Sequence, residues 1–152
     1  MLDFDAYLRR IGLDPADKPT WPAVHRAHAT RIPFENLDSH RGLPISLAQA
    51  DLERKLVASR RGGYCFEHNL LLASALEHMG LVVEPMLARV IVGGARRETR
   101  QASHLVLRVT DRDGRRPGRT GSGRAACRAR TRHRPGRRPP AVGLELPGGA
   151  GR

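Results

Sequence analysis

The composition of this chain changes abruptly near residue 111, and the change limits how much of it can fold. The last 42 residues, 111–152, contain 12 Arg, 9 Gly, 5 Pro and 5 Ala, with no Lys, Ile, Phe, Tyr, Trp or Met. A segment so poor in large apolar side chains cannot bury enough surface to offset the entropy of ordering it. We therefore expect residues 111–152 to form a disordered basic tail and the folded part to end near residue 110.

The formal net charge of +12 belongs mostly to that tail. Residues 1–110 carry 15 basic and 12 acidic side chains, a net of +3, whereas residues 111–152 carry 12 Arg and 3 acids, a net of +9. An Arg-rich tail can bind RNA or DNA through phosphates, but such tails usually mix in lysine and stacking aromatics. A GC-rich gene read out of frame also produces Arg, Gly, Pro and Ala. We favour the frame error and do not expect a nucleic-acid partner.

The first 80 residues carry apolar side chains at helical spacing, which predicts four helices. Thr20 and Ser46 are suitable N-caps, and Gly12 and Gly80 follow two of the helix ends. The stretch RIPFENLDSHRG between the second and third helices is expected to be a loop. The expected helices are Asp3–Ile11, Thr20–Ala29, Ser46–Ser59 with Leu47, Leu52 and Leu56 facing inward, and Tyr64–Met79.

Two apolar, β-branched runs follow, PMLARVIVGG (85–94) and SHLVLRVT (103–110), and they read as a hairpin-like pair of strands. Helices followed by strands predict an α+β fold rather than alternating βαβ units. We divide the chain into a helical bundle at 1–80, a strand-bearing part at 81–110 and the basic tail at 111–152.

The chain has two cysteines, Cys65 and Cys127, too few for a disulfide framework, which fits a reducing, cytoplasmic compartment. We expect neither a signal peptide at MLDFDAYLRR nor a membrane-spanning segment. The histidines show no metal-ligand spacing, so we expect no metal.

Cys65 follows two glycines and opens the fourth expected helix. A thiol in the first turn of a helix feels the positive end of the helix dipole, which favours the thiolate. Gly62 and Gly63 permit backbone angles that a side chain would forbid and so can shape a tight turn into the helix. The same pattern also suits a small buried hydrophobic residue, so spacing alone leaves both interpretations open.

Three stretches resemble signatures of the arylamine N-acetyltransferase family. RRGGYCFEHN (60–69) resembles its cysteine motif, RIPFENLD (31–38) its other N-terminal signature, and SHLVLRV (103–109) its histidine strand. The resemblance covers residues 1–116, in the order of the family. It implies the cysteine-protease-like Cys-His-Asp superfamily, in which a helical bundle is followed by the first strands of a β-barrel.

The resemblance also implies a reaction. An acetyl group would pass from acetyl-CoA to a cysteine thioester and then to an arylamine, arylhydrazine or arylhydroxylamine, as in xenobiotic metabolism. Coenzyme A and a small aromatic amine or hydrazine would be the partners. A related reading is an amide synthase of macrolactam antibiotic assembly, which would use the same cysteine.

By position in the family motifs, Cys65 is the implied nucleophile and His104 the base. Glu35 and Arg60 resemble an ion pair that braces the loop before the cysteine, alongside Gly62 and Gly63. The motifs do not indicate which residues would bind coenzyme A.

Three further residues have alternative readings. His68 lies three residues after Cys65 on the helix and is the alternative base. Glu67 is expected either to cap the helix or to be solvated, and Asp38 is expected to be a turn residue.

The family supplies its triad aspartate about sixteen or seventeen residues after the histidine, in a stretch resembling DVGFG. Here Thr120 and Gly121 stand at that distance, and neither is acidic. Asp111 and Asp113 are the nearby alternatives, although TDRDGRR is typical of a turn after a strand. The resemblance therefore implies an enzyme that is weak or inactive as written.

We predict a frame error in the gene near codons 111–117. Shifting the codons of Pro117–Arg124 by two bases can encode Trp-Ala-Asp-Gly-Phe-Gly, which places an aspartate at position 120. Resequencing the locus and translating all three frames tests this. The expected result is a shifted frame that continues with alternating apolar strands and a DVGFG-like stretch. If no frame does so, the tail is native and the triad stops at two residues.

Overall fold

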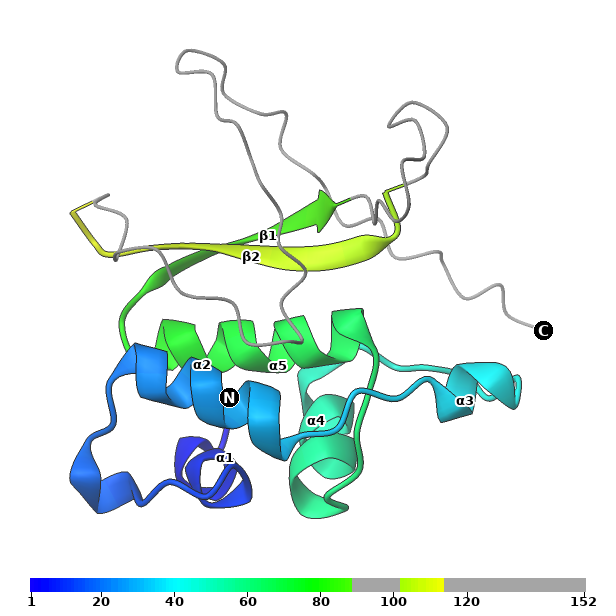
Figure 1. The fold of residues 1–152 in the computed structure, drawn as a ribbon, viewed down its shortest axis with the longest axis horizontal. Coiled ribbons are helices and arrows are strands. Elements are labelled where there is room, and N and C mark those ends of the chain that lie inside the picture. The colour runs from blue at the N-terminus through cyan, green and yellow to red at the C-terminus, as the bar shows by residue number, and fades with distance from the viewer. Residues whose placement is uncertain (89–101, 114–152) are drawn as a thin grey trace, which may run out of the picture.

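A computed structural model describes residues 1–88 and 102–113 of the chain. In it a layer of helices supports a two-stranded sheet, and α5 lies between the sheet and the other helices (Figure 1). In chain order the elements are α1 (Phe4–Arg10), the 3₁₀ turn η1 (Pro15–Asp17), α2 (Trp21–Arg31), α3 (Leu37–His40), α4 (Gln49–Leu52), the π-helical η2 (Glu53–Ala58), α5 (Cys65–His78), β1 (Val82–Ala88) and β2 (His104–Thr110).

Helix α5 is the centre of the described fold. Its apolar positions recur at helical spacing, and most of its side chains are buried because neighbours cover it on two sides. Both strands pack on one side of it, and α1, α2 and α4 approach from the other (Figure 1). A helix covered in this way needs apolar residues around most of its circumference. The core around it contains Tyr7, Leu8, Ile11, Val24, Leu56, Leu71, Ala75 and Leu76, each at most 1% exposed.

The sheet is an antiparallel pair in which Val82 lies opposite Thr110 and Ala88 opposite His104. Side chains alternate between the two faces, and Val83, Leu107 and Val109 pack on the helical core. On the other face Arg108 pairs with Glu84 directly across the ladder. The sheet thus has one face on the helices and another that carries the Arg108–Glu84 pair.

The expected helices are present, with differences at their ends. Asp3 caps α1 through Ala6 N, and Ile11 ends it. Thr20 is the N-cap residue of α2, without a side-chain bond, and α2 continues to Arg31, two residues further than expected.

The third helix differs most from expectation. It starts at Gln49 rather than at Ser46, whose hydroxyl instead accepts a bond from Ala48 N at 3.3 Å. After Leu52 it continues as the π-helical η2, which ends at Ser59. Leu52 and Leu56 are buried as predicted, whereas Leu47 is only half-buried.

The loop expected at RIPFENLDSHRG contains structure of its own. Leu37–His40 form the short helix α3, and Phe34 makes a parallel bridge with Gly63. The first strand begins at Val82, three residues earlier than predicted, and residues 89–94 of that prediction lie outside the described part. The order of helices and strands confirms the α+β class. The predictions of a β-barrel and of a disordered tail depend on residues outside 1–88 and 102–113 and remain predictions. Within residues 1–88 and 102–113, every helix is too short or too polar to cross a bilayer.

We predict that replacing Leu71 with alanine destabilises the protein by about 3 kcal/mol, because removing its fully buried side chain would leave a cavity in the core between α5 and its neighbours. The measurement is the midpoint of urea or thermal unfolding by circular dichroism. Leu43→Ala is the matched control, since Leu43 is 46% exposed and should cost less than about 0.5 kcal/mol. Equal losses in both variants would show that α5 is not the core helix.

Candidate active site around Cys65

Cys65 is the first residue of α5 and is 7% exposed. The helix begins there because Glu67, in its first turn, folds back and accepts a hydrogen bond from the Tyr64 N–H at 3.0 Å. This confirms the capping alternative for Glu67, which is 2% exposed rather than solvated. The thiol therefore lies at the buried N-terminal end of a 14-residue helix, where the backbone N–H groups favour negative charge.

Gly62 and Gly63 are required for space rather than for unusual backbone angles. A Cβ on Gly62 would lie 2.1 Å from the Pro33 oxygen, and one on Gly63 would lie 2.7 Å from Glu67 Oε2. Neither glycine has a positive φ, so our expectation of forbidden backbone angles was wrong. They let the loop before Cys65 pass directly against the segment after Pro33 and against the cap of α5.

Two backbone hydrogen bonds fix that contact. Glu35 N donates to Gly63 O at 2.9 Å, and Gly63 N donates to Pro33 O at 3.3 Å, around the parallel bridge between Phe34 and Gly63. The two sequence signatures, RIPFENLD and RRGGYCFEHN, are thus joined backbone to backbone just before the cysteine.

The ion pair predicted for Glu35 and Arg60 is wrong in its basic partner. Arg61 supplies the guanidinium, with Nη2 at 3.1 Å from Glu35 and 2.6 Å from Asp38. Asp38 is therefore an ion-pair residue and not simply a turn residue, and it also receives Lys55 Nζ at 2.8 Å. The bonds from Arg61 and then Lys55 lower the pKa of Asp38 to about 2.

Arg60 contributes its backbone instead of its side chain. Its φ of 52° is left-handed, uncommon for a residue with a Cβ, and its carbonyl accepts from Arg10 Nη2 at 3.2 Å. The Arg10 guanidinium is buried and also donates to the carbonyls of Leu56 (2.7 Å), Arg31 (2.9 Å) and Arg61 (3.4 Å). One side chain thereby ties the ends of α2 and η2 to the loop before Cys65.

His104 is brought to the neighbourhood of Cys65, but the two side chains are not hydrogen-bonded. Cys65 Sγ lies 3.9 Å from the Ser103 carbonyl, one residue before His104, which is the first residue of β2. Asn69 holds the two elements together, because its Nδ2 donates to Cys65 O at 2.8 Å and to Leu105 O at 2.9 Å. The structure thus places the start of β2 at the cysteine.

The alternative triad acid, Asp111, is at the wrong end of the strand. It follows the last residue of β2, whereas His104 is the first. At a rise of about 3.3 Å per residue the two lie roughly 23 Å apart along the strand. Thr120 and Gly121, where the family pattern would place the aspartate, are outside the described residues.

His68 is occupied in a buried hydrogen-bonded chain and is not free to act as a base. Its Nε2 is 3.1 Å from Pro33 O, its Nδ1 is 3.0 Å from His28 Nε2, and His28 Nδ1 is 2.9 Å from the Tyr7 hydroxyl. Because a carbonyl only accepts, His68 Nε2 must donate, and each following bond must then point the same way with both rings neutral. Tyr7 therefore donates to His28, and His28 donates to His68.

Burial favours that neutral state. It lowers the pKa of His28 well below its ordinary value, and the nearby His68, His25 and Arg10 act in the same direction. Burial also lowers the pKa of His68, against the opposing effect of the bond to Pro33.

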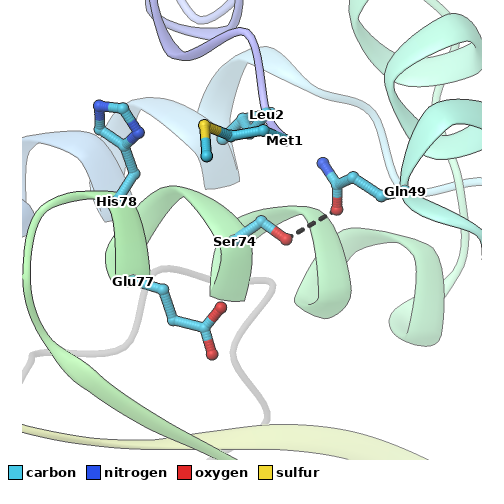
Figure 2. Close-up of a pocket in the computed structure, with 6 residues that line it drawn as sticks. All are labelled: Met1, Leu2, Gln49, Ser74, Glu77 and His78. Carbon is cyan, nitrogen blue, oxygen red and sulfur yellow. Dashed lines mark hydrogen bonds between the residues drawn. The ribbon is translucent and has the colours of Figure 1, made fainter.

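A surface hollow elsewhere on α5 does not belong to this site. Figure 2 shows its lining residues, with Ser74 donating to Gln49 Oε1 at 2.7 Å. Ser74 lies nine residues after Cys65, about 13 Å further along the helix. The hollow is lined by Met1, Leu2, Gln49, Ser74, Glu77 and His78.

A family model described as N-acetyltransferase matches residues 19–132, three quarters of the chain. An arylamine N-acetyltransferase of Mycolicibacterium smegmatis is 48% identical over 94 residues, which cover 59% of this chain and 34% of the relative. The chain thus spans about a third of that relative's length. The family match also reaches beyond residue 116, where we expected the resemblance to end.

Solved structures give the same result. The arylamine N-acetyltransferase of Nocardia farcinica superposes with a TM-score of 0.64 at 46% identity, covering 74% of this chain and 40% of that one. The Mycobacterium marinum enzyme, solved in complex with CoA, gives 0.63 at 39% identity, covering 78% and 44%.

The structure brings Cys65, at the capped start of α5, to the start of the strand that begins with His104. The chain belongs to the arylamine N-acetyltransferase family.

Three site residues were missed by the sequence analysis. Arg10 and His28 lie in α1 and α2 and Lys55 in the π-helical η2, and their partners are between 12 and 51 residues away in sequence. A basic residue or histidine at a position that should face the core was the available signal, because such groups are rarely buried without partners.

We predict that the chain loses stability as the pH falls below the ordinary histidine pKa of about 6.5. His28 and His68 have lowered pKa values in the fold, so the unfolded chain binds more protons in that range and unfolding is favoured, by up to about 1.4 kcal/mol per pH unit for each proton. The measurement is the thermal midpoint between about pH 7.5 and pH 5.

The double variant H28Q/H68Q should show a shallower pH dependence. His40→Gln, at an exposed position, should keep the wild-type dependence. An unchanged slope in the double variant would contradict the neutral pair.

Proposed function

We propose that this chain carries the acetyl-accepting part of an arylamine N-acetyltransferase, with Cys65 as the nucleophile and His104 as its base. The observation that carries the proposal is the position of Cys65. It is the first residue of a long capped helix, nearly buried, and in contact with the residue that precedes His104.

In the first half-reaction the Cys65 thiolate attacks the carbonyl carbon of acetyl-CoA. The tetrahedral adduct expels the thiolate of coenzyme A, which takes a proton from the His104 imidazolium, and the acetyl group remains on Cys65 as a thioester. The N-terminal end of α5 favours the thiolate that begins this step.

In the second half-reaction the amine of an arylamine, arylhydrazine or arylhydroxylamine attacks the thioester carbon. His104 accepts the amine proton, and the bond to sulfur breaks to give the acetylated product and the Cys65 thiolate beside the His104 imidazolium, ready for the next cycle. The family of the chain supports this reaction, and the relative solved with CoA supports acetyl-CoA as the donor. The low cysteine content supports a cytoplasmic location.

The ion pairs and the glycine contact also help to position Cys65. They hold the loop before Cys65 rigid through Arg61, Asp38 and Gly62, so that the sulfur meets the start of β2 without further rearrangement. A third triad member would orient His104. The resemblance places it at position 120 or 121, where the sequence has Thr120 and Gly121, and for this reason we expect weak turnover from the chain as written.

We predict that Cys65 reacts with iodoacetamide at lower pH than Cys127, because Cys65 lies at a helix start, whereas Cys127 belongs to the Arg-rich segment that the sequence predicts to be disordered. Labelling from about pH 5 to pH 9, with each site located by mass spectrometry, measures both thiols in the same sample. With acetyl-CoA the wild-type chain and C127S should gain an acetyl group on Cys65, and C65S should not. Labelling of Cys65 only above about pH 8, as for an ordinary thiol, would remove it as the nucleophile.

A further inference from the structure

The cap of α5 creates an electrostatic conflict at Cys65. Glu67 turns back to accept from Tyr64 N and pairs with Lys55, and its carboxylate is buried in the helix turn that contains the thiol. A negative charge at that position opposes a thiolate in the same turn. Glu67, whose side chain caps α5, therefore opposes the thiolate form of Cys65 at the first position of the same helix.

Lys55 lies where it can cancel this charge. Its Nζ is 2.7 Å from Glu67 Oε1 and 2.8 Å from Asp38 Oδ2, and its side chain is 17% exposed. Burial opposes the charged form, but the bonds to Asp38 and Glu67 outweigh it and raise the pKa of Lys55, so the ammonium is retained. Asp38 has a second cation in Arg61, whereas the described ion pairs give Glu67 Lys55 alone.

We propose that Lys55 is a positioning residue that neutralises Glu67, so that the cap of α5 does not suppress the thiolate of Cys65. This inference rests on the proposed role of Cys65 as the nucleophile. Lys55 acts through the carboxylate and touches neither the sulfur nor a substrate.

Other charged or titratable groups near this turn are accounted for. On α5 they are Tyr64 and His68, and β2 contributes His104. The pKa of Tyr64 is raised, mainly by burial and then by the charges of Glu67 and Cys65. The carboxylate and the thiol therefore both lie close enough to Tyr64 to affect its charge. Asp38 and Arg61 complete the set from the loop side. Of these groups Asp38 also contacts Lys55, and it keeps Arg61 as an ion-pair partner when Lys55 is changed.

The test is the pH midpoint of iodoacetamide labelling at Cys65 in the full chain, with the modified peptide located by mass spectrometry. In Lys55→Met the carboxylate is left unpaired, and the midpoint should rise by on the order of one pH unit. Lys55→Arg, which keeps the charge, should stay within about 0.3 unit of wild type. Arg54→Met is the matched control, because Arg54 is 74% exposed on the same helix and pairs with Asp51, and it should leave the midpoint unchanged.

Glu67→Gln keeps the proposal testable if Lys55→Met does not fold. Removing the carboxylate while Lys55 remains should lower the midpoint, and the double variant K55M/E67Q should return it to within about 0.3 unit of wild type. A purely structural Lys55 would change thermal stability and leave these midpoints where they are. That result would overturn the inference while the nucleophile proposal stands. An ordinary midpoint in the wild-type chain would instead overturn both.

Discussion

The backbone of Gly62 passes so close to the carbonyl of Pro33 that a single methyl group at that position would collide with it. The rest of the site is arranged around this contact. Glu35 and Gly63 add backbone hydrogen bonds on either side of it, and Arg61 pairs with the Glu35 carboxylate. His68 donates to the same Pro33 oxygen. The contact fixes the loop that precedes Cys65 beside Pro33, in addition to the bonds that Arg10 makes to the carbonyls of Arg60 and Arg61.

Polar side chains inside this small core are paired almost entirely across long stretches of sequence. The Tyr7–His28–His68 chain joins α1, α2 and α5, while Lys55 joins η2 to the cap of α5. Such bonds contribute modestly to the free energy of unfolding, but breaking one leaves a buried group unsatisfied, which costs more. They therefore specify one arrangement of the helices, and that arrangement fixes where the cysteine meets β2.

The sequence predicted the helices, the two strands and the position of Cys65 at a helix start, because apolar spacing and caps are local signals. It misassigned the partner of Glu35, since Arg60 and Arg61 are adjacent and only the left-handed turn at Arg60 decides which side chain faces the carboxylate. It explained Gly62 by backbone angle where the cause is a contact with a residue 29 positions away. Pairings of that kind depend on tertiary packing and leave no local pattern.

The guanidinium of Arg10 bonds to four main-chain carbonyls and, among the described ion pairs, to no carboxylate. Every residue type has a carbonyl, so the side chains at 31, 56, 60 and 61 can change in evolution without removing an acceptor. Arg10 itself has no such freedom, because the single ammonium of a lysine lacks the planar fork that reaches four acceptors from three segments. The fold thus tolerates substitutions at the four residues whose carbonyls accept these bonds, but it depends on arginine at position 10, which joins them.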